Sequence, residues 1–343
     1  MKYIIETEKL TKKYGDFTAV NSLTMKIPKN SIFGMLGPNG AGKTTTIKML
    51  TCLAYPSSGT ATVSRFDIQK NPNEVRETLG MVPQHVSLYK DLTVLENAEL
   101  CADFYGVKEE DKLDRINELM DLVDITYAKD KRIGQLSGGQ KQKASLVASL
   151  VHRPEILFLD EPTIGLDPTT KRILWELMED LNSSGHTIIL CSHDMHEVDR
   201  LCDNVAIINT GNLVAYDSPR GLKDILLNEE KQNYSNIKET LSNIQNNNEK
   251  LEFNYRRLSF LIENISDELI NNLKSIDFVF DVNISKQGRV ELQVDKFEDK
   301  AINNITSSII KDGGIISSFS SEEPSLEDVF IKVTSEAEDD ARA

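Results

Sequence analysis

The feature that most constrains the fold is a glycine-rich turn between an apolar segment and a helical one. Residues 31–36 are apolar enough for a buried strand, and residues 46–53 have helical character. The turn between them matches the pattern G-x-x-x-x-G-K-[ST] in full from Gly37 to Thr44. Strand, glycine-rich turn and helix in this order predict a phosphate-binding loop within an α/β fold.

The residue types in this turn suit a nucleoside triphosphate. Glycines let consecutive backbone N–H groups curl around the β- and γ-phosphates, and the following helix points its positive end at them. Lys43 supplies a positive charge, and Thr44 is the predicted Mg²⁺ ligand. A plain surface turn is the alternative, which the flanking strand and helix disfavour. The predicted nucleotide contacts are Gly37, Pro38, Asn39, Gly40, Ala41, Gly42, Lys43, Thr44 and Thr45.

A second apolar segment, residues 155–159, ends in the two carboxylates Asp160 and Glu161. Its continuous apolar character, like that of residues 187–191, is typical of parallel strands covered on both faces. An acid at the end of such a strand, beside a phosphate loop, can hold hydrated Mg²⁺, and its neighbour can polarise the attacking water. We therefore assign Asp160 to the metal and Glu161 to the general base. Paired acids are also common in solvated turns, so this assignment depends on the phosphate loop.

Charge and hydropathy restrict the partners. The formal net charge of −15 argues against a nucleic-acid binder. Residues 1–50 nevertheless carry eight Lys and three acids, whereas residues 301–343 carry three basic residues and nine acids. No window approaches the roughly 18 consecutive apolar residues of a membrane span, and no secretory signal is expected. The four cysteines lack C-x-x-C spacing and are expected to be buried thiols.

The first part of the chain combines strand-like and helical patterns. Strand-like runs at residues 3–10 and 19–28, with a turn at 14–16, predict a small antiparallel layer. Residues 92–151 place apolar side chains at three- and four-residue spacing, which predicts a helical insert. Residues 204–217 predict a hairpin.

A polar stretch, residues 228–250, marks the start of a second domain. Beyond it the patterns read strand, helix, strand, strand, helix and strand, at residues 257–262, 267–273, 278–284, 290–294, 299–310 and 315–319. This order predicts a ferredoxin-like arrangement. The acidic end, residues 336–343, is expected to be frayed.

The segment Leu136-Ser137-Gly138-Gly139-Gln140 narrows the family. Ser137 and the glycines expose N–H groups at a helix N-terminus, which again suits a phosphate. A flexible turn that caps a helix is the alternative interpretation of this segment taken alone. Together with the other motifs, the segment makes the chain resemble the ABC ATPases, whose signature motif it matches, over about residues 1–222. The resemblance implies a P-loop NTPase ABC cassette: an α/β, RecA-like core with an antiparallel β layer and a helical subdomain.

The resemblance and the residue patterns together divide the chain. We expect an ATP-binding cassette at residues 1–222, with its helical subdomain at about 85–151. A polar linker or helix is expected at 223–250, a small ferredoxin-like α+β accessory domain at 251–334, and an acidic tail at 335–343.

Further site residues follow from the resemblance, position by position. Tyr14 matches an aromatic that stacks on adenine, although a single Tyr in a turn often only packs. Gln84 matches the glutamine that reaches Mg²⁺ and the water and couples them to the membrane partner. Asp167 lies in the loop that crosses between protomers. His193 matches the switch histidine that contacts the γ-phosphate, although a lone His after a strand is usually structural. The signature residues Ser137, Gly138, Gly139 and Gln140 are expected to contact the nucleotide of the neighbouring cassette.

The implied assembly contains more than this chain. Two cassettes, identical or related, would dimerise head to tail on Mg²⁺ and ATP, and a separate transmembrane permease subunit would hold them at the cytoplasmic face of the cell membrane as peripheral proteins. The segment from Glu323 to Ile331 resembles the end of ATPases from ABC-2-type exporters, the drug-resistance and sodium-extrusion group. Alternatively, Pro324 only starts an amphipathic helix that packs on the accessory domain. An importer ATPase, or a soluble ABC ATPase acting on ribosomes or DNA, is the other reading.

Overall fold

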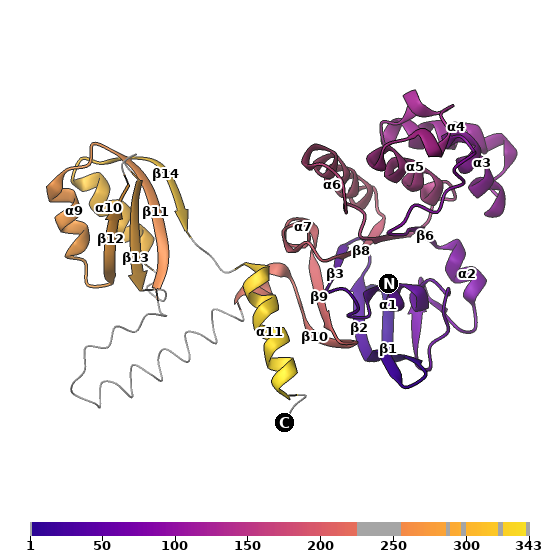
Figure 1. Ribbon diagram of the computed structural model, residues 1–343, viewed down its shortest axis with the longest axis horizontal. Helices are drawn as coiled ribbons and strands as arrows, with labels where there is room; N and C mark the ends of the chain where they lie inside the picture. The colour runs from indigo at the N-terminus through magenta and orange to yellow at the C-terminus, as the bar shows by residue number, and fades with distance from the viewer. Residues whose placement is uncertain (1, 225–254, 286–288, 296–299, 322–324, 341–343) are drawn as a thin grey trace. The chain divides into compact units, whose positions relative to one another are not determined.

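The computed structural model describes residues 2–224, 255–285, 289–295, 300–321 and 325–340, which Figure 1 traces as ribbons. The chain forms two compact units. The first contains residues Met1–Leu222 together with Leu326–Ala343, and the second contains Lys223–Ser325. From residue 225 onward, the predicted polar linker lies outside the described residues.

The core of the first unit is a six-stranded sheet with the order β10-β9-β3-β8-β7-β6. Its strands are β3 (Ile32–Leu36), β6 (Leu79–Val82), β7 (Ile156–Asp160), β8 (Thr187–Ser192), β9 (Asn204–Asn209) and β10 (Asn212–Asp217). Every residue of β3, β7 and β8 is buried, which explains their uninterrupted apolar sequence. Leu36 pairs with Ser192, and Asp160 pairs with Cys191, so three strands end at the same edge.

An antiparallel layer of four strands, ordered β2-β1-β4-β5, packs against this core. Its members are β1 (Tyr3–Tyr14), β2 (Phe17–Pro28), β4 (Ser58–Val63) and β5 (Phe66–Asp67). Helix α1 (Lys43–Leu50) contributes Ile47, Met49 and Leu50 to the same buried cluster as Phe33. The predicted antiparallel layer is thus present, with β4 and β5 added from a stretch that the sequence patterns left unassigned.

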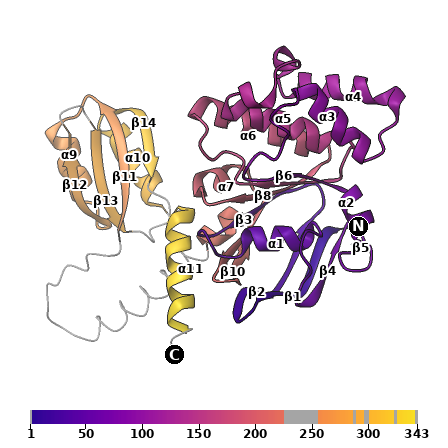
Figure 2. The same ribbon diagram turned by 45° about the vertical axis from the view of Figure 1, so that its right-hand side comes forward.

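Most helices between residues 94 and 183 gather away from the antiparallel layer, whereas α1 lies beside it, as both views show (Figures 1 and 2). Within the predicted helical insert lie α3 (Val94–Phe104), α4 (Glu109–Leu122) and α5 (Gly138–Leu150), with short 3₁₀ turns at Thr126–Ala128 and Ile133–Gln135. Three further helices were not assigned from the sequence, namely α2 (Pro72–Glu77), α6 (Pro168–Ser183) and α7 (Met195–Leu201). None of the described helices is long and apolar enough to cross a bilayer.

The last helix, α11 (Leu326–Asp340), contacts α7 and β10 and belongs to the first unit. The sequence suggested instead that this helix packs on the accessory domain. Its apolar residues recur at helical spacing, and Leu326 and Val329 are almost fully buried. The helix also continues into the stretch expected to be frayed, while Pro324 lies outside the described residues.

The second unit is a four-stranded antiparallel sheet with the order β12-β13-β11-β14. Its elements are β11 (Tyr255–Glu263), α9 (Asp267–Lys274), β12 (Val279–Ile284), β13 (Arg289–Asp295), α10 (Ala301–Lys311) and β14 (Ile315–Ser321). Apolar residues from one face of the sheet and from both helices form one buried cluster. The predicted β-α-β-β-α-β order is confirmed.

Candidate active site

The phosphate loop joins β3 to α1, and its glycines have two separate physical roles. Gly40 and Gly42 have φ angles of 84° and 108°, in the left-handed region that other residues avoid. Gly37 has no such angle, but a Cβ there would lie 2.3 Å from the backbone oxygen of Ile208. The loop can therefore curl tightly above α1 while its first residue passes close to β9.

The loop borders an open cavity of about 250 Å³. Its described lining contains nearly all the predicted phosphate and metal residues: Pro38, Asn39, Gly40, Ala41, Gly42, Lys43, Thr44, Thr45, Gln84, Asp160 and Glu161. Tyr14 lies at the same cavity, together with Phe17 and Ala19 from the start of β2. Phe17 was not predicted from the sequence, although an aromatic three residues after Tyr14, across one hairpin turn, was the available indication.

Asp160 and Thr44 meet at the end of β7. The Thr44 hydroxyl donates to Asp160 Oδ2 at 3.1 Å, while Asp160 Oδ1 is buried without a hydrogen-bond partner among the described residues. Burial raises the pKa of the Asp160 carboxyl, and the Thr44 hydrogen bond only partly offsets this effect. A hydroxyl, a carboxylate with an unused oxygen and the Gln84 amide at one cavity are oxygen ligands of the kind that Mg²⁺ prefers. The residues present therefore fit the predicted cation.

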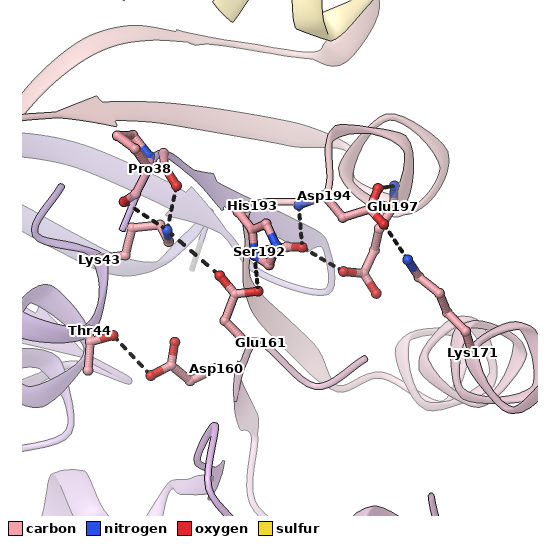
Figure 3. Close-up of polar contacts among 11 residues, drawn as sticks. Pro38, Lys43, Thr44, Asp160, Glu161, Lys171, Ser192, His193, Asp194 and Glu197 are labelled. Carbon is pink, nitrogen blue, oxygen red and sulfur yellow. Dashed lines mark hydrogen bonds and ion pairs between the residues drawn. The ribbon is translucent and has the colours of Figure 1, made fainter. Parts of the chain in front are cut away.

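Glu161 is held between two cationic or potentially cationic groups (Figure 3). Its Oε2 lies 2.7 Å from His193 Nδ1, and its Oε1 lies 3.8 Å from Lys43 Nζ. Lys43 Nζ also donates to the backbone oxygens of Gly37 and Pro38 at 2.5 and 3.3 Å. Both Lys43 and Glu161 are buried, whereas the His193 side chain is half exposed.

The backbone of Glu161 adopts φ 53°, a left-handed conformation that is unfavourable for a residue with a side chain. Residues in such conformations cluster at functional sites because the surrounding structure must hold them there. The conformation turns the chain directly after β7, so that two consecutive acids, Asp160 and Glu161, both line the cavity.

The signature residues lie at the N-terminus of α5, outside the described lining of the cavity. The Ser137 hydroxyl accepts from Gln140 N at 3.4 Å, and Gln140 Oε1 accepts from Ser137 N at 2.9 Å, which forms a capping box. Ser137 and Gly138 are exposed, so this helix N-terminus faces solvent. Within one chain, the structure does not bring the signature and the phosphate loop together.

Asp167 likewise lies outside that lining. It is the N-cap of α6, where one carboxylate oxygen accepts from the backbone N–H groups of Thr169 and Thr170, each at 3.1 Å. The hydroxyl of Thr170 donates to the other oxygen at 2.6 Å, and this hydrogen bond is the largest cause of a lowered pKa at Asp167. The side chain is therefore an ionised cap at the start of α6.

Comparisons with known proteins identify both units. A family model described as "ABC transporter" matches residues 20–164, and one described as "ATP-binding protein DrrA1-3-like, C-terminal domain" matches residues 228–334. The Nod factor export ATP-binding protein I of Burkholderia orbicola is 37% identical over 218 residues, which cover 64% of this chain and 72% of that protein. The linearmycin resistance ATP-binding protein LnrL of Bacillus subtilis is 38% identical over 212 residues, which cover 62% of this chain and 68% of that protein.

A solved structure shares the fold. It is cbiO1 from Clostridium perfringens, described as part of the ABC transporter complex cbiONQ, and it superposes with a TM-score of 0.61 at 27% identity. The match covers 71% of this chain and 100% of that chain. Because the identity with ATP-binding proteins extends over more than two thirds of their length, and the fold is that of their cassettes, the chain belongs to the ATP-binding proteins of the ABC transporter family.

Proposed function

We propose that this chain is the ATP-hydrolysing subunit of an ABC exporter and that a separate permease forms the membrane part. The observation that carries the proposal is the convergence of Lys43, Thr44, Asp160 and Glu161 on one cavity. Each of these residue types is needed to bind a triphosphate or to attack it with water, and they come from two segments more than 100 residues apart in the sequence.

Binding of ATP would use the phosphate loop and the start of α1. The N–H groups of the loop and the N-terminus of α1 would hold the phosphates, and Lys43 would exchange the oxygens of Gly37 and Pro38 for phosphate oxygens. Thr44, Asp160 and Gln84 would hold Mg²⁺. The bound cation supplies positive charge that neutralises the phosphate oxygens.

Hydrolysis would use Glu161 as the general base. In the structure its carboxylate lies beside Lys43 and His193, both of which the family resemblance assigns to the phosphates. When those two groups turn to ATP, the carboxylate becomes available to accept a proton from the attacking water. The proton passes to Glu161, the water oxygen bonds to the γ-phosphorus, and ADP leaves.

A complete site would need two cassettes. The solvent-facing N-terminus of α5, with Ser137 and the glycines, lies outside the lining of its own chain's cavity, yet it is built to bind an anion. We infer that it covers the γ-phosphate in a neighbouring cassette, identical or related, in a head-to-tail dimer. Asp167 would stabilise the start of α6 beside that interface.

The permease would dock in a second hollow, of about 170 Å³, lined by residues of β6, α3 and α5. Phe104 is 74% exposed there, and Tyr89 borders it as well. The buried Asn97 side chain shapes this border, because its amide accepts from Tyr89 N at 2.8 Å and donates to Tyr89 O at 3.1 Å. Exposed aromatics beside a hollow are typical of protein contacts. Part of the lining of this hollow follows Gln84 closely in the sequence. Gln84 would therefore couple a permease bound in the hollow to the phosphate site.

Export is favoured over import by the second unit, because its matching family model describes the C-terminal domain of DrrA1-3-like ATP-binding proteins. The compared relatives are named for Nod factor export and linearmycin resistance. In such an assembly this chain would be peripheral at the cytoplasmic face of the membrane. A role on ribosomes or DNA is disfavoured by the net charge of −15.

The Glu161→Gln variant tests the catalytic assignment. Gln keeps the shape of the side chain but cannot accept the proton, so ATP should stay bound and hold two chains together. With Mg²⁺ and ATP, we expect the variant to elute as a dimer in size-exclusion chromatography and to lose at least about 100-fold in turnover. Glu161→Gln combined with Lys43→Ala should remain monomeric, because it lacks the phosphate-binding charge.

Two outcomes would contradict the proposal at different levels. Turnover of Glu161→Gln at the wild-type rate would show that another group is the base. Failure of the wild-type chain to bind ATP would remove the function altogether. Glu155→Gln is a matched control, since this acid precedes β7, is 44% exposed and lies outside the described lining of the cavity, so it should leave turnover unchanged.

A surface substitution tests the permease site. Phe104→Asp removes the exposed aromatic and adds a charge, so we expect at least tenfold less co-purifying permease from membranes, while basal ATP turnover is retained. Tyr55→Asp is the matched control, because Tyr55 is 71% exposed and lies outside the described lining of this hollow. Equal losses in both variants would show that the hollow is not the docking site.

A further inference from the structure

A buried polar network adjoins the His193 loop, and no step described above uses it; Figure 3 draws its members Ser192, Asp194 and Glu197. Its centre is Glu197, whose side chain is fully buried. Glu197 Oε1 accepts from the indole Nε1–H of Trp175 at 2.8 Å, and Oε2 accepts from the hydroxyl of Ser192 at 2.7 Å. The Ser192 oxygen in turn accepts from the backbone N–H of Asp194 at 3.0 Å.

This network connects two segments that flank the active site. Ser192 is the last residue of β8 and immediately precedes His193, while Glu197 lies in the first turn of α7. Trp175 belongs to α6, which begins directly after the loop containing Asp167. The carboxylate of Glu197 therefore bonds the strand end that carries His193 to the helix that follows the 165–167 loop.

A second connection runs parallel to the first. Lys171, one turn before Trp175 on α6, forms an ion pair with Asp194, the N-cap of α7. Burial tends to raise the pKa of Asp194, but Lys171 and backbone N–H groups outweigh it and leave the pKa below its usual value. Lys171 Nζ also lies 5.3 Å from the centre of the Trp175 ring. Residues on both sides of His193 are thus fixed to α6.

A buried carboxylate is a costly way to fill space. Taking an ionised carboxyl out of water is strongly unfavourable, and an apolar side chain of similar size often packs at least as stably. The two side chains that donate hydrogen bonds to the Glu197 carboxylate are neutral: one is an indole and the other a hydroxyl. The carboxylate adds directional hydrogen bonds, because its two oxygens fix the relative position of α6 and the end of β8.

We propose that Glu197 is a positioning residue that holds the His193 loop to helix α6, so that His193 and the 165–167 loop move as one body when two cassettes close on ATP. The inference rests on the proposed function, because it assigns His193 to the γ-phosphate. Glu197 acts through Ser192 and Trp175 and does not touch the nucleotide. Its loss should slow the chemical step much more than it weakens ATP binding.

Steady-state ATP hydrolysis by the purified full chain tests the proposal. In Glu197→Ala we expect kcat to fall at least about tenfold while KM changes less than about twofold, because misplacement of a catalytic group slows chemistry without removing binding contacts. Glu197→Gln should restore most of the lost rate, since its amide can accept from Trp175 and donate to Ser192. Trp175→Phe, which keeps an aromatic ring but removes the donor, should also lower kcat and guards against misfolding of the alanine variant.

Trp175 provides a second readout, because it is the only tryptophan in the chain. In the wild-type protein, Mg²⁺ and ATP should leave its fluorescence emission unchanged, because Trp175 keeps its bond to Glu197 while the His193 loop and α6 move as one body. In Glu197→Ala the emission should change when Mg²⁺ and ATP are added, because the loop and α6 are no longer joined at this point. Val198→Ala is the matched control, since Val198 is the next residue of α7, is fully buried and has an apolar side chain. It should keep both the kcat and the constant emission of the wild-type protein.

The possible outcomes distinguish a failure of the positioning role of Glu197 from a failure of the proposed ATPase function. Wild-type kcat in Glu197→Ala or in Trp175→Phe would overturn the positioning role, as would an equal loss of kcat in Val198→Ala. Absence of ATP turnover in the wild-type chain would overturn the proposed function, and this inference with it. Turnover that depends on Glu197, tolerates Val198→Ala and returns with Glu197→Gln would establish the role.

Discussion

Two aromatic side chains, Tyr14 and Phe17, stand at the mouth of the phosphate cavity with 51% and 64% of their surface exposed. The exposure of such large apolar groups beside the phosphate loop is explained if a flat base covers them. The ammonium group of Lys12 already lies 5.0 Å from the centre of the Tyr14 ring, which leaves the opposite face of that ring for a partner.

We therefore expect both rings to contribute to nucleotide affinity. Tyr14→Ala and Phe17→Ala should each weaken binding of a fluorescent ATP analogue by about tenfold, because stacking of a base on an aromatic side chain contributes about 1–3 kcal/mol. Tyr14→Phe should retain the wild-type affinity. An unchanged affinity in Phe17→Ala would restrict the adenine contact to Tyr14.

His152 is a partly buried imidazole whose hydrogen bonding fixes which ring nitrogen carries the hydrogen in the neutral form. Its Nε2 lies 3.0 Å from the backbone oxygen of Leu79, which can only accept, so Nε2 carries the hydrogen. Its Nδ1 is buried without a partner among the described residues, and its ring stacks on Tyr105 with centroids 3.6 Å apart. Burial lowers the pKa of His152, an effect that the Leu79 hydrogen bond only partly opposes.

The sign of the pH effect follows from this lowered pKa. The unfolded chain binds a proton at His152 near pH 6.5, whereas the folded chain does so only at lower pH, so stability is lost as pH falls below about 6.5. His152→Gln should therefore reduce the drop in melting temperature between pH 7.5 and pH 5.5. His85→Gln, a change at an exposed position, should leave the drop unchanged. An unaltered drop in His152→Gln would show that other groups determine the acid sensitivity.

At the scale of elements, glycine at position 80 sets the contact between β6 and α5. A Cβ there would lie 2.2 Å from the backbone oxygen of Ser149, so β6 or α5 would have to shift to admit it. Gly80→Ala should destabilise the chain by about 1–3 kcal/mol, the usual effect of overpacking. Thermal unfolding should show a melting temperature lower by roughly 3–10 °C.

Gly138, at the other end of α5, is a glycine without the crowding found at Gly80. The nearest atom to an added Cβ, Leu166 Cδ2, would lie 3.9 Å away, so Gly138→Ala should be neutral or stabilising for the fold, whatever its effect on turnover. Equal melting temperatures for the two alanine variants would mean that α5 can shift away from β6.

The elements that the sequence predicted best are those with uninterrupted apolar patterns. β3, β7 and β8 lie within one residue of their expected bounds, because burial on both faces leaves no room for polar residues. Helix α1 begins at Lys43, three residues earlier than its pattern indicated, since the left-handed Gly42 already ends the loop. β6 has only four residues, too few for a periodic pattern, and α6 was missed although Asp167 and Pro168 are a strong start signal.

The candidate site was predictable wherever its residues belong to one contiguous motif. The phosphate loop and the acids at 160 and 161 could be located from the amino-acid sequence alone, and the structure places them at one cavity. The left-handed backbone of Glu161, the contact between Lys43 and Glu161, and the Glu197 network could not, because each depends on how the chain is arranged after folding.

At the scale of the whole molecule, the chain's last helix belongs to its first unit. Residues 223–325 separate α11 from the rest of that unit in the sequence, yet α11 packs on α7 and β10. We infer that α11 completes the cassette. A chain that ends at residue 222 should therefore expose the apolar surface that Leu326 and Val329 now cover.

The stability of two shortened chains tests this inference. One chain ends at residue 222, and the other joins residue 222 to residues 326–343 through about 20 Gly and Ser residues, which reach roughly 25 Å. Burial of an aliphatic side chain contributes about 1.5–3 kcal/mol, so the two residues should raise the melting temperature of the linked chain by roughly 6–20 °C over the truncated one. In the linked chain, Leu326→Asp with Val329→Asp should remove the difference, because the helix would be present but unable to pack. If the linked and truncated chains melt together, α11 does not stabilise the cassette.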